Sequence, residues 1–500
     1  MSDTILAALT HRATADSVPL LTFDDRSYTA AELVAGAGQI AAALAAHGVV
    51  AGDRVALMHA NDPAFVMAYF GIQALRAVVV LVNTQYRALE LRHILADSGA
   101  RVALVDGESA LALAPLRSEL PALADVLVAE TLLGGVQVAL PHDAPQPGDI
   151  ALIGYTSGTT GRAKGAMLTH ANLFANSTAV CDAWRWTNTD RLLLTLPLFH
   201  IHGLGVGLHG TILSGGRVDL RGSFVAPDAL DALATAAITM FFGVPTMYTR
   251  LIDEAARRGT PIPPIRLYVS GSAPLSPQTF AEFAQLAGQP ILERYGMTET
   301  VMNLTNPCDG ERRPGTVGMP FPGQEARVVD VRSRQVLGDE RDGEIQVRGP
   351  HVFAGYWNRP DATAEAFTAD RWFSTGDLGR RDAAGYYTIT GRARELIISG
   401  GFNIYPREVE EALLLHPQVE EAAVLGLPDR EFGEHVAAVV VCTMPLTAAQ
   451  LTAWCRAHLA SYKKPRSLFV ARSLPRNALG KIQKHLLRAA IEHGELERLD

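Results

Sequence analysis

The feature that most constrains this fold is a repeated alternation of short apolar runs with helical segments over the first two-thirds of the chain. RVALMHA at 54–60 has the length and composition of a buried strand, AFVMAYFGIQALRA at 64–77 predicts the helix after it, and VVVLVN at 78–83 predicts another strand. Strand, helix and strand in this order form a βαβ unit, whose two strands are parallel. Strands that are apolar throughout are buried on both faces of their sheet. The chain therefore predicts a largely parallel, layered α/β core.

Four more apolar runs, at 149–156, 191–198, 238–245 and 265–272, predict further buried strands like those at 54–60 and 78–83. Beyond them the pattern of residues changes twice. From about residue 320 the pattern becomes one of strands and turns, as in 343–357, and a second change comes near 391–406. After it the sequence predicts a helix, two strands and two more helices, at 408–416, 421–427, 436–442, 448–459 and 481–493. These suffice for a small α+β domain of about a hundred residues.

Composition excludes several classes of partner. A formal net charge of -8 gives no general attraction to nucleic acid or to an anionic membrane. The four cysteines form no CxxC pair, which argues against a disulfide scaffold and a thiolate zinc site and favours a reducing compartment. The N-terminus has no long apolar run, and no stretch reaches the ~20 apolar residues of a membrane span. We therefore expect a soluble cytoplasmic protein without nucleic-acid or membrane partners.

The strongest local signal is YTSGTTGRAKGAMLTH at 155–170. It combines glycines, whose backbone N–H groups can approach an anion closely, with hydroxyl donors and positive charge. These residues are Thr156, Ser157, Gly158, Thr159, Thr160, Gly161, Arg162, Lys164 and Gly165. The segment follows a predicted strand and should emerge at its carboxyl end, where open α/β sheets bind ligands. It is not a Walker A loop, because Lys164 is followed by glycine and not by serine or threonine. A flexible polar turn is the alternative.

The full string TSGTTG-x-x-KG resembles the phosphate loop of the adenylate-forming superfamily, which includes acyl-CoA synthetases, luciferases and the adenylation domains of peptide synthetases. Other motifs of that superfamily follow in the expected order: SGSAPL at 270–275, YGMTE at 295–299, STGD at 374–377, GRARELIISGG at 391–401 and PRNALGK at 475–481. The resemblance implies an N-terminal domain over 1–391 that binds ATP and an acyl group and has a β-rich subdomain. It also implies a hinge at 392–396, with Arg394 as pivot, and a mobile C-terminal lid over 397–500.

The resemblance assigns roles to individual residues. It implies ATP contacts at Thr156, Ser157, Gly158, Thr159, Thr160, Lys164, Gly271, Ser272, Ala273, Glu293, Tyr295, Thr298, Asp377, Arg392 and Lys481. Mg²⁺ prefers oxygen ligands and usually takes only one or two carboxylates, which suits Glu299 together with Thr156. Lys481, Glu299 and Lys164 are the expected catalytic residues. Ser399, Gly400 and Gly401 would line the path of the CoA pantetheine.

The implied chemistry has two steps, with ATP and CoA as co-substrates. A carboxylate attacks the α-phosphorus of ATP, and the thiol of CoA then displaces AMP from the mixed anhydride. Negative charge crowds the α-phosphate and the departing pyrophosphate, so preorganised N–H groups, Mg²⁺ and a lysine stabilise the transition state. Acetylation of Lys481 would remove its charge, which makes a lysine acetyltransferase a conceivable partner.

An arginine in ILERYGMTETVMN, at 291–303, bears on the choice of acid. The guanidinium of Arg294 stays ionised, so a buried Arg294 needs an anion. Its Cα lies within ~18 Å of that of Glu299 even in a fully extended chain. That close to the reacting carboxylate, a second anion must belong to a short, doubly charged acid such as malonate or methylmalonate. The alternative is that Arg294 pairs with Glu293 or with the nucleotide.

The segments LPLFHIHGL, GVPTMYTRL, SGSAPL and ERYGMTET-x-MN together resemble malonyl-CoA synthetases. The resemblance places His200 beside the acyl group, as a donor or as a pocket wall, while His202 is more often structural. Ile201 and Met302 would bound the malonate methylene, although core packing also explains them, and Ser272 is a weaker polar candidate. We expect a malonate–CoA ligase and leave methylmalonate open. A monocarboxylate–CoA ligase of the same fold is the nearest alternative, and an amino-acid-activating module is a further one.

Overall fold

The computed structural model describes the chain except for residues 1, 2, 16, 137, 142, 157–162, 236, 237, 400, 401, 430, 431, 460, 478, 479 and 500, and except for the side chains at 235, 394, 402 and 403. The chain divides into two compact units. The first comprises Met1–Ala326 and Val347–Phe373, and the second comprises Arg327–Gln346 and Ser374–Asp500. Among the described helices, none combines the length and the apolar character that a membrane crossing needs.

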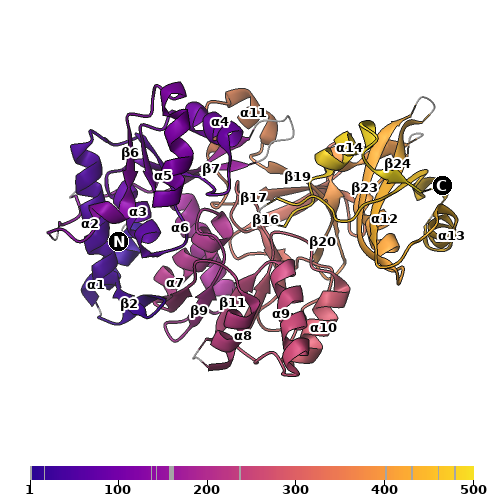
Figure 1. The fold of residues 1–500 in the computed structure, drawn as a ribbon, viewed down its shortest axis with the longest axis horizontal. Coiled ribbons are helices and arrows are strands. Elements are labelled where there is room, and N and C mark those ends of the chain that lie inside the picture. Colours follow the sequence, from indigo (N-terminus) through magenta and orange to yellow (C-terminus); the bar gives the residue numbers. More distant parts are fainter. Residues whose placement is uncertain are drawn as a thin grey trace. The chain divides into compact units, whose positions relative to one another are not determined.

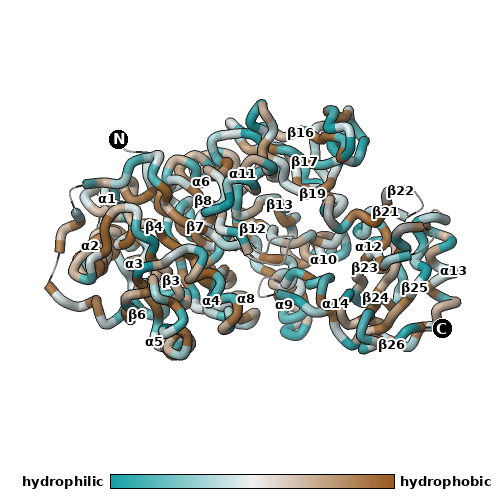
Figure 2. Tube along the Cα trace, turned by 90° about the horizontal axis from the view of Figure 1, so that it is seen from above, coloured by the Kyte–Doolittle hydropathy of each residue, from teal (hydrophilic) through white to brown (hydrophobic). Residues whose placement is uncertain are grey.

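A seven-stranded sheet in the first unit has the order β18-β8-β7-β4-β3-β5-β6, and Figure 1 labels its strands β6 and β7. The bounds are β3 Arg54–Met58, β4 Val78–Leu81, β5 Val102–Val105, β6 Asp125–Val128, β7 Ile150–Thr156, β8 Lys164–Thr169 and β18 Gly355–Tyr356. Strands β3 to β7 are parallel, and the predicted βαβ unit is confirmed as β3, helix α3 (Pro63–Ala74) and β4. All four residues of β4 are buried and apolar, and they form a continuous hydrophobic segment of the trace (Figure 2).

Strand β8 was not predicted from the sequence. It runs antiparallel to β7, with Thr156 opposite Lys164, so the glycine-rich segment joins the two strands of a hairpin. Glycine and alanine in KGAMLT weaken the strand signal, because neither has high strand propensity. Helix α6 (His170–Ala183) follows β8, and Thr169 caps it by accepting a hydrogen bond from the N–H of Asn172.

The second sheet of this unit has nine strands in the order β15-β14-β13-β12-β11-β9-β10-β1-β2. Its bounds are β1 Pro19–Phe23, β2 Arg26–Thr29, β9 Arg191–Leu194, β10 Arg217–Leu220, β11 Met240–Gly243, β12 Leu267–Ser270, β13 Leu292–Tyr295, β14 Leu304–Thr305 and β15 Met319–Pro320. The strands from β13 to β1 are parallel. The runs predicted at 191–198, 238–245 and 265–272 are therefore strands, shorter than expected, whose carboxyl ends meet at one edge.

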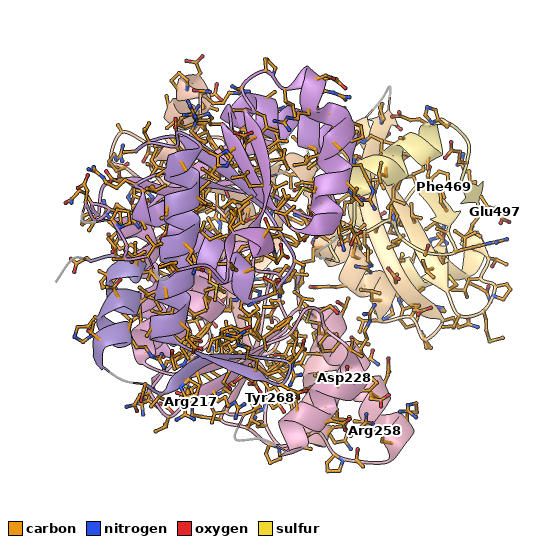
Figure 3. All side chains as sticks on the ribbon, turned by 60° about the vertical axis from the view of Figure 1, so that its left-hand side comes forward. Arg217, Asp228, Arg258, Tyr268, Phe469 and Glu497 are labelled. Carbon is orange, nitrogen blue, oxygen red and sulfur yellow. The ribbon has the colours of Figure 1, made fainter. Side chains whose placement is uncertain are left out.

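Helices cover these sheets. The remaining helices of the first unit are α1 Ile5–Ala15, α2 Ala30–Ala46, α4 Ala88–Ser98, α5 Gly107–Leu113, α7 His209–Ser214, α8 Ala226–Thr235, α9 Pro245–Arg258, α10 Pro277–Ala287 and α11 Pro360–Ala366, with a π-helix at His202–Leu208. Apolar residues of α8, α9 and α10 pack on β9, β11 and β12 in one buried cluster. Figure 3 shows Tyr268 of β12 with Asp228 and Arg258 of the covering helices. An ion pair of Arg258 with Asp231 joins α8 to α9.

Two further sheets consist mainly of residues of the second unit. The four-stranded one has the order β16-β17-β19-β20, and the other has the order β22-β21-β24-β25-β26 with β23 paired to β24. Their bounds are β16 Glu325–Val329, β17 Gly343–Arg348, β19 Phe373–Arg381, β20 Tyr387–Arg392, β21 Ile397–Ser399, β22 Phe402–Ile404, β23 Val419–Asp429, β24 Gly433–Cys442, β25 Ser467–Val470 and β26 Glu497–Arg498. Helices α12 (Pro406–Leu414), α13 (Ala448–His458) and α14 (Lys484–Glu492) complete the second unit. The α/β fold class is confirmed, while the boundaries at 391 and 396 stay a prediction.

Candidate active site

A cluster around Glu299 lies in the first unit. Glu299 is buried, and its Oε1 accepts hydrogen bonds from the hydroxyl of Tyr356 at 3.0 Å and from that of Thr156 at 3.4 Å. The Nζ of Lys164 lies 5.1 Å from the centroid of the Tyr356 ring. Burial and the Glu299 carboxylate raise the pKa of Tyr356, so its hydroxyl stays a donor at ordinary pH. The fold thus gathers three residues that the sequence predicted separately, Thr156, Lys164 and Glu299.

Thr298 lies against strand β7. A methyl group on Gly154 would lie 2.5 Å from Cγ2 of Thr298, so only glycine leaves room for this contact. Thr298 therefore stands beside the strand from which the glycine-rich segment emerges. The predicted phosphate contacts Ser157, Gly158, Thr159 and Thr160 lie outside the described residues.

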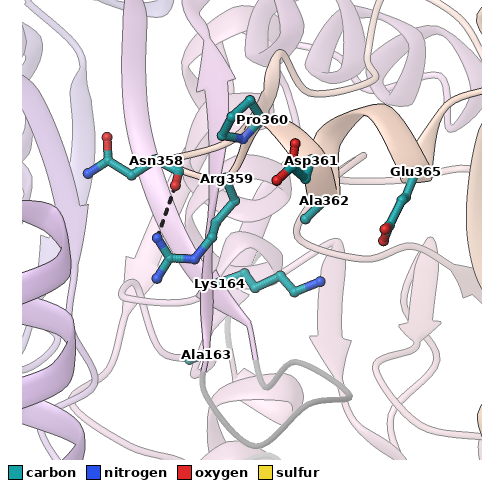
Figure 4. A pocket seen from close by; sticks show the side chains of 8 residues that line it. All are labelled: Ala163, Lys164, Asn358, Arg359, Pro360, Asp361, Ala362 and Glu365. Carbon is teal, nitrogen blue, oxygen red and sulfur yellow. Dashed lines mark hydrogen bonds between the residues drawn. The ribbon is translucent and has the colours of Figure 1, made fainter.

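Lys164 also lines a cavity of about 520 Å³ (Figure 4). The other lining residues are Ala163, Asn358, Arg359, Pro360, Asp361, Ala362 and Glu365. Arg359 donates hydrogen bonds to the carboxylate of Asp97 at 2.6 Å and to the backbone oxygen of Asn358 at 3.0 Å. Its charge is therefore matched within the protein. Within the described part of the chain, Lys164 forms no ion pair, which suits a role toward an external anion.

Arg294 is fully enclosed. It lies in β13 with 2% of its surface exposed, and its Nε and Nη2 have no hydrogen-bond partner among the described residues. Neighbouring residues of a strand point to opposite faces, and Glu293 accepts a hydrogen bond from the N–H of Leu275 at 3.0 Å. Burial lowers the pKa of Arg294 to about 9, opposed only by the nearby Tyr248 phenol. No carboxylate of the described chain compensates this guanidinium.

The surroundings of Arg294 come from the carboxyl edge of the parallel strands. A methyl group on Gly271 would lie 2.6 Å from Nε and Nη1, so the guanidinium rests on the bare backbone after β12. Burial, reinforced by the charge of Arg294, lowers the pKa of His200 to about 4 and that of His202 well below its ordinary value. Both imidazoles are neutral at ordinary pH, and Nδ1 of His202 lies 3.2 Å from Oγ of Ser272. Arg294 is therefore the positive charge of this group.

Apolar side chains adjoin the same region. Ile201 and Met302 are buried, and a methyl group on Gly205 would lie 2.7 Å from Cδ1 of Ile201 and 3.3 Å from Cγ1 of Val301. Val301 has φ of 59°, a left-handed conformation that is unusual for a β-branched residue. The sequence analysis did not single out Val301, because nothing in the pattern of residues signals a strained backbone.

Residues predicted to bind the nucleoside lie in both units. In the second unit, Asp377 and Arg392 are opposite each other on β19 and β20, and Arg392 Nε lies 2.9 Å from Asp377 Oδ1. Asp377 is almost completely buried. In the first unit, Ala273 and Tyr295 are partly exposed, at the loop after β12 and at the end of β13.

Two hydrogen bonds between Lys481 and Asn477 hold the loop that carries Lys481. The N–H of Lys481 donates to Asn477 Oδ1, and the N–H of Asn477 donates to the Lys481 carbonyl, both at 2.9 Å. The helix predicted from Lys481 begins only at Lys484, so that prediction was wrong at its start. Lys484 Nζ lies 2.7 Å from Glu410 and 3.1 Å from Glu395. Burial pushes the pKa of Glu395 upward, but Lys484 and the nearby Lys481 bring it below its ordinary value.

Several predicted residues have no described site geometry. Gly400 and Gly401 lie outside the described residues, as does the side chain of Arg394, while Ser399 is a buried residue at the end of β21. Conversely, sequence reasoning missed Tyr356 and the Lys484–Glu395 pair. Their partners lie 57 and 89 positions away in the sequence, and no local signal connects residues so far apart.

Comparison with known proteins places this geometry in a family. Residues 9–357 match the AMP-binding enzyme family, and residues 408–481 match the AMP-binding enzyme C-terminal domain. A sulfoacetate–CoA ligase of Cupriavidus necator is 39% identical over 501 residues, which cover 96% of this chain and 97% of the relative. A mitochondrial malonate–CoA ligase of Homo sapiens is 35% identical over 491 residues, covering 89% and 84%. The crystal structure of ATP-bound MatB from Rhodopseudomonas palustris is 37% identical, with a TM-score of 0.92 and coverage of 98% and 99%.

Proposed function

This chain belongs to the AMP-binding enzymes and is an AMP-forming acyl-CoA ligase, and from that premise we propose that its acid is a short dianion, with malonate as the first candidate. The acid would first displace pyrophosphate from ATP to give an acyl-adenylate. The thiol of CoA would then take the acyl group and release AMP. One malonate, one ATP and one CoA thus give malonyl-CoA, AMP and pyrophosphate.

The Glu299 cluster suits the first step. Its donor set is oxygen from a carboxylate and a hydroxyl, which fits Mg²⁺, and we propose that Glu299 and Thr156 hold the ion. When bound, Mg²⁺ would neutralise phosphate charge. Lys164 and Thr298 adjoin the glycine-rich segment and would position the phosphates, while Asp377 and Arg392 would hold the ribose.

One observation carries the choice of a dianion: Arg294 is buried without a partner for Nε and Nη2 among the described residues. Leaving a buried charge unpaired costs several kcal/mol, on the order of 3–5. A distal carboxylate would accept both free N–H groups in a bidentate pair and so fix which end of the acid faces ATP. Acetate, propionate and butyrate would leave the charge unmatched. His200 and Ser272 stay candidates for further polar contacts, and Ile201 and Met302 for the apolar boundary of the methylene.

Sulfoacetate is the second candidate. Like malonate, it carries one methylene between its carboxylate and a distal anion, here a sulfonate, and the relative that bears its name is similar over nearly its whole length. A guanidinium pairs with either oxyanion. Arginine forms bidentate pairs with planar carboxylates and with tetrahedral oxyanions alike, so Arg294 alone does not choose between the two acids. Malonate stays the first candidate because the chain is also similar to malonate–CoA ligases.

A substrate panel tests the proposal. Pyrophosphate release is measured with malonate, methylmalonate, sulfoacetate and butyrate as the acid. We expect kcat/KM for malonate to exceed that for butyrate roughly a thousandfold or more, because sites built around a polar group reject analogues that leave it unpaired. A higher value for sulfoacetate than for malonate would favour the second candidate. Equal values for butyrate and malonate would contradict a dianion substrate altogether.

Gly271→Ala should weaken the proposed pairing of Arg294 with the distal carboxylate of the acid by displacing the Arg294 side chain. The added methyl group would overlap the guanidinium of Arg294, which must tilt away from its present position. We expect KM for malonate to rise roughly tenfold or more, because misplacing a charged partner by about 1 Å costs on the order of a hundredfold in rate. Gly107→Ala is the matched control, since its methyl group would meet no atom within 4 Å. Unchanged KM in Gly271→Ala would show that the guanidinium is not held against this backbone.

A further inference from the structure

A histidine and two carboxylates meet at the carboxyl edge of the seven-stranded sheet, on strands that the proposed active site does not use. His59 follows β3, Asp62 caps α3, and Glu130 follows β6, two positions along from β3 in the sheet; Figure 1 labels α3 and β6. One ligand atom from each residue lies within 4.8 Å of the others. The carboxyl ends of parallel strands are where open α/β sheets bind ligands.

The tautomer of His59 is set by its backbone contact. Its Nδ1 lies 3.0 Å from the carbonyl oxygen of Ala60. A carbonyl can only accept, so Nδ1, which also lies 3.4 Å from Oδ1 of Asp62, carries a proton, and Nε2 is the ring nitrogen that can offer a lone pair. The ring is completely buried, and Nε2 has no hydrogen-bond partner among the described residues.

Nε2 lies beside an acceptor. It is 3.1 Å from Oε1 of Glu130, close enough for an ion pair but without the alignment of a hydrogen bond. An unprotonated Nε2 and this oxygen repel each other at such a distance unless a cation lies between them. Ligand atoms around a tetrahedral zinc ion stand about 3.3 Å apart and off each other's bond axes. The His59–Glu130 arrangement therefore suits a metal ion better than a proton on Nε2.

We propose that His59, Asp62 and Glu130 form a binding site for one divalent transition-metal ion, with Zn²⁺ as the expected occupant. One imidazole and two carboxylates are typical zinc ligands, and the partial exposure of Glu130 leaves a fourth position for water. The ion would join the start of α3 to the 3-10 helix Ala129–Leu132, which packs against it. The site is structural, since none of its ligands belongs to the proposed catalytic cluster.

Zinc titration of the full-length protein, after removal of metals with a chelator, tests the site. Competition with a chromophoric chelator measures the number of ions bound and their affinity in the wild type, His59→Gln, Glu130→Gln and His47→Gln. His47 is the matched control, because its Nδ1 lies 2.9 Å from the carboxylate of Asp125 and forms no ion pair with a second carboxylate among the described residues. We expect one ion to be lost in His59→Gln, bound roughly tenfold or more weakly in Glu130→Gln, and retained in His47→Gln.

Thermal unfolding gives a second, independent readout. An ion that binds only the folded chain raises Tm, so zinc should raise the Tm of the wild type and of His47→Gln by a few degrees, roughly, and leave that of His59→Gln unchanged. The same stoichiometry and Tm shift in the wild type and His59→Gln would place zinc elsewhere and overturn the proposal. Absence of zinc binding by a wild type that unfolds cooperatively would overturn it as well, and would leave a proton to hold the His59–Glu130 contact.

Discussion

Lys481→Ala is expected to reduce the rate of adenylation several hundredfold while sparing thioester formation from supplied malonyl-adenylate. A single donor aimed at charge that develops in the transition state contributes ~3–4 kcal/mol, which corresponds to this loss. The second step no longer needs that donor, since the α-phosphate has already been attacked. Pyrophosphate release from ATP and malonate measures the first step, and thioester formation from the adenylate measures the second.

Lys463→Ala is the control for Lys481→Ala. Lys463 belongs to the same unit and pairs with Glu408, so its removal also deletes one positive charge without touching the PRNALGK loop. Acetylated Lys481 should behave as alanine does, because acetylation removes the charge, whether or not a lysine acetyltransferase acts on it in the cell. Adenylation near the wild-type rate in Lys481→Ala would contradict its catalytic assignment, and equal loss of both steps would indicate a structural role.

The fold was predictable where local composition determines the outcome. Val78–Leu81 is short and apolar throughout, which predicted the buried strand that the structure has there. Prediction failed where such signals were weak, as in the glycine-containing strand Lys164–Thr169. It also failed at the start of α14, because the pattern of apolar residues does not distinguish Lys481 in a loop from Lys484 in a helix.

In the candidate site, too, some residues could be predicted from sequence motifs, while their contacts could not. The motifs identified Thr156 and Glu299, but their hydrogen bond joins residues 143 positions apart, at the end of β7 in one sheet and after β13 in the other, and depends on how the fold brings the two sheets together. Tyr356 completes that cluster from a two-residue strand with no signal of its own. For Arg294 the sequence indicated a need for an anion, and only the structure shows that Glu293 faces away and that Gly271 makes room. The chemical role of a residue can be predicted from its type and its motif, whereas the residues that it contacts are determined by the fold.

Arg294→Met should abolish discrimination between acids and at the same time stabilise the protein without substrate. Methionine fills much of the volume of arginine but carries no charge, so the buried, unpaired guanidinium disappears. We expect kcat/KM for malonate to fall roughly 100- to 1,000-fold, since a buried charge pair is worth about 3–5 kcal/mol, while KM for ATP changes little. Replacing a buried charge by an apolar side chain stabilises proteins by ~1–4 kcal/mol, so Tm without substrate should rise.

The effect of malonate on Tm tests whether Arg294 binds the acid directly. A ligand that binds only the folded protein raises Tm with its concentration, so malonate should stabilise the wild type and have no effect on Arg294→Met. Arg294→Lys keeps a charge but lacks the planar fork, and should recover part of the malonate affinity and lose the gain in Tm. An equal loss of affinity for ATP in Arg294→Met would move Arg294 to the nucleotide. A fall in Tm would mean that the guanidinium already has a partner in the folded chain, and the case for a doubly charged acid would then be lost.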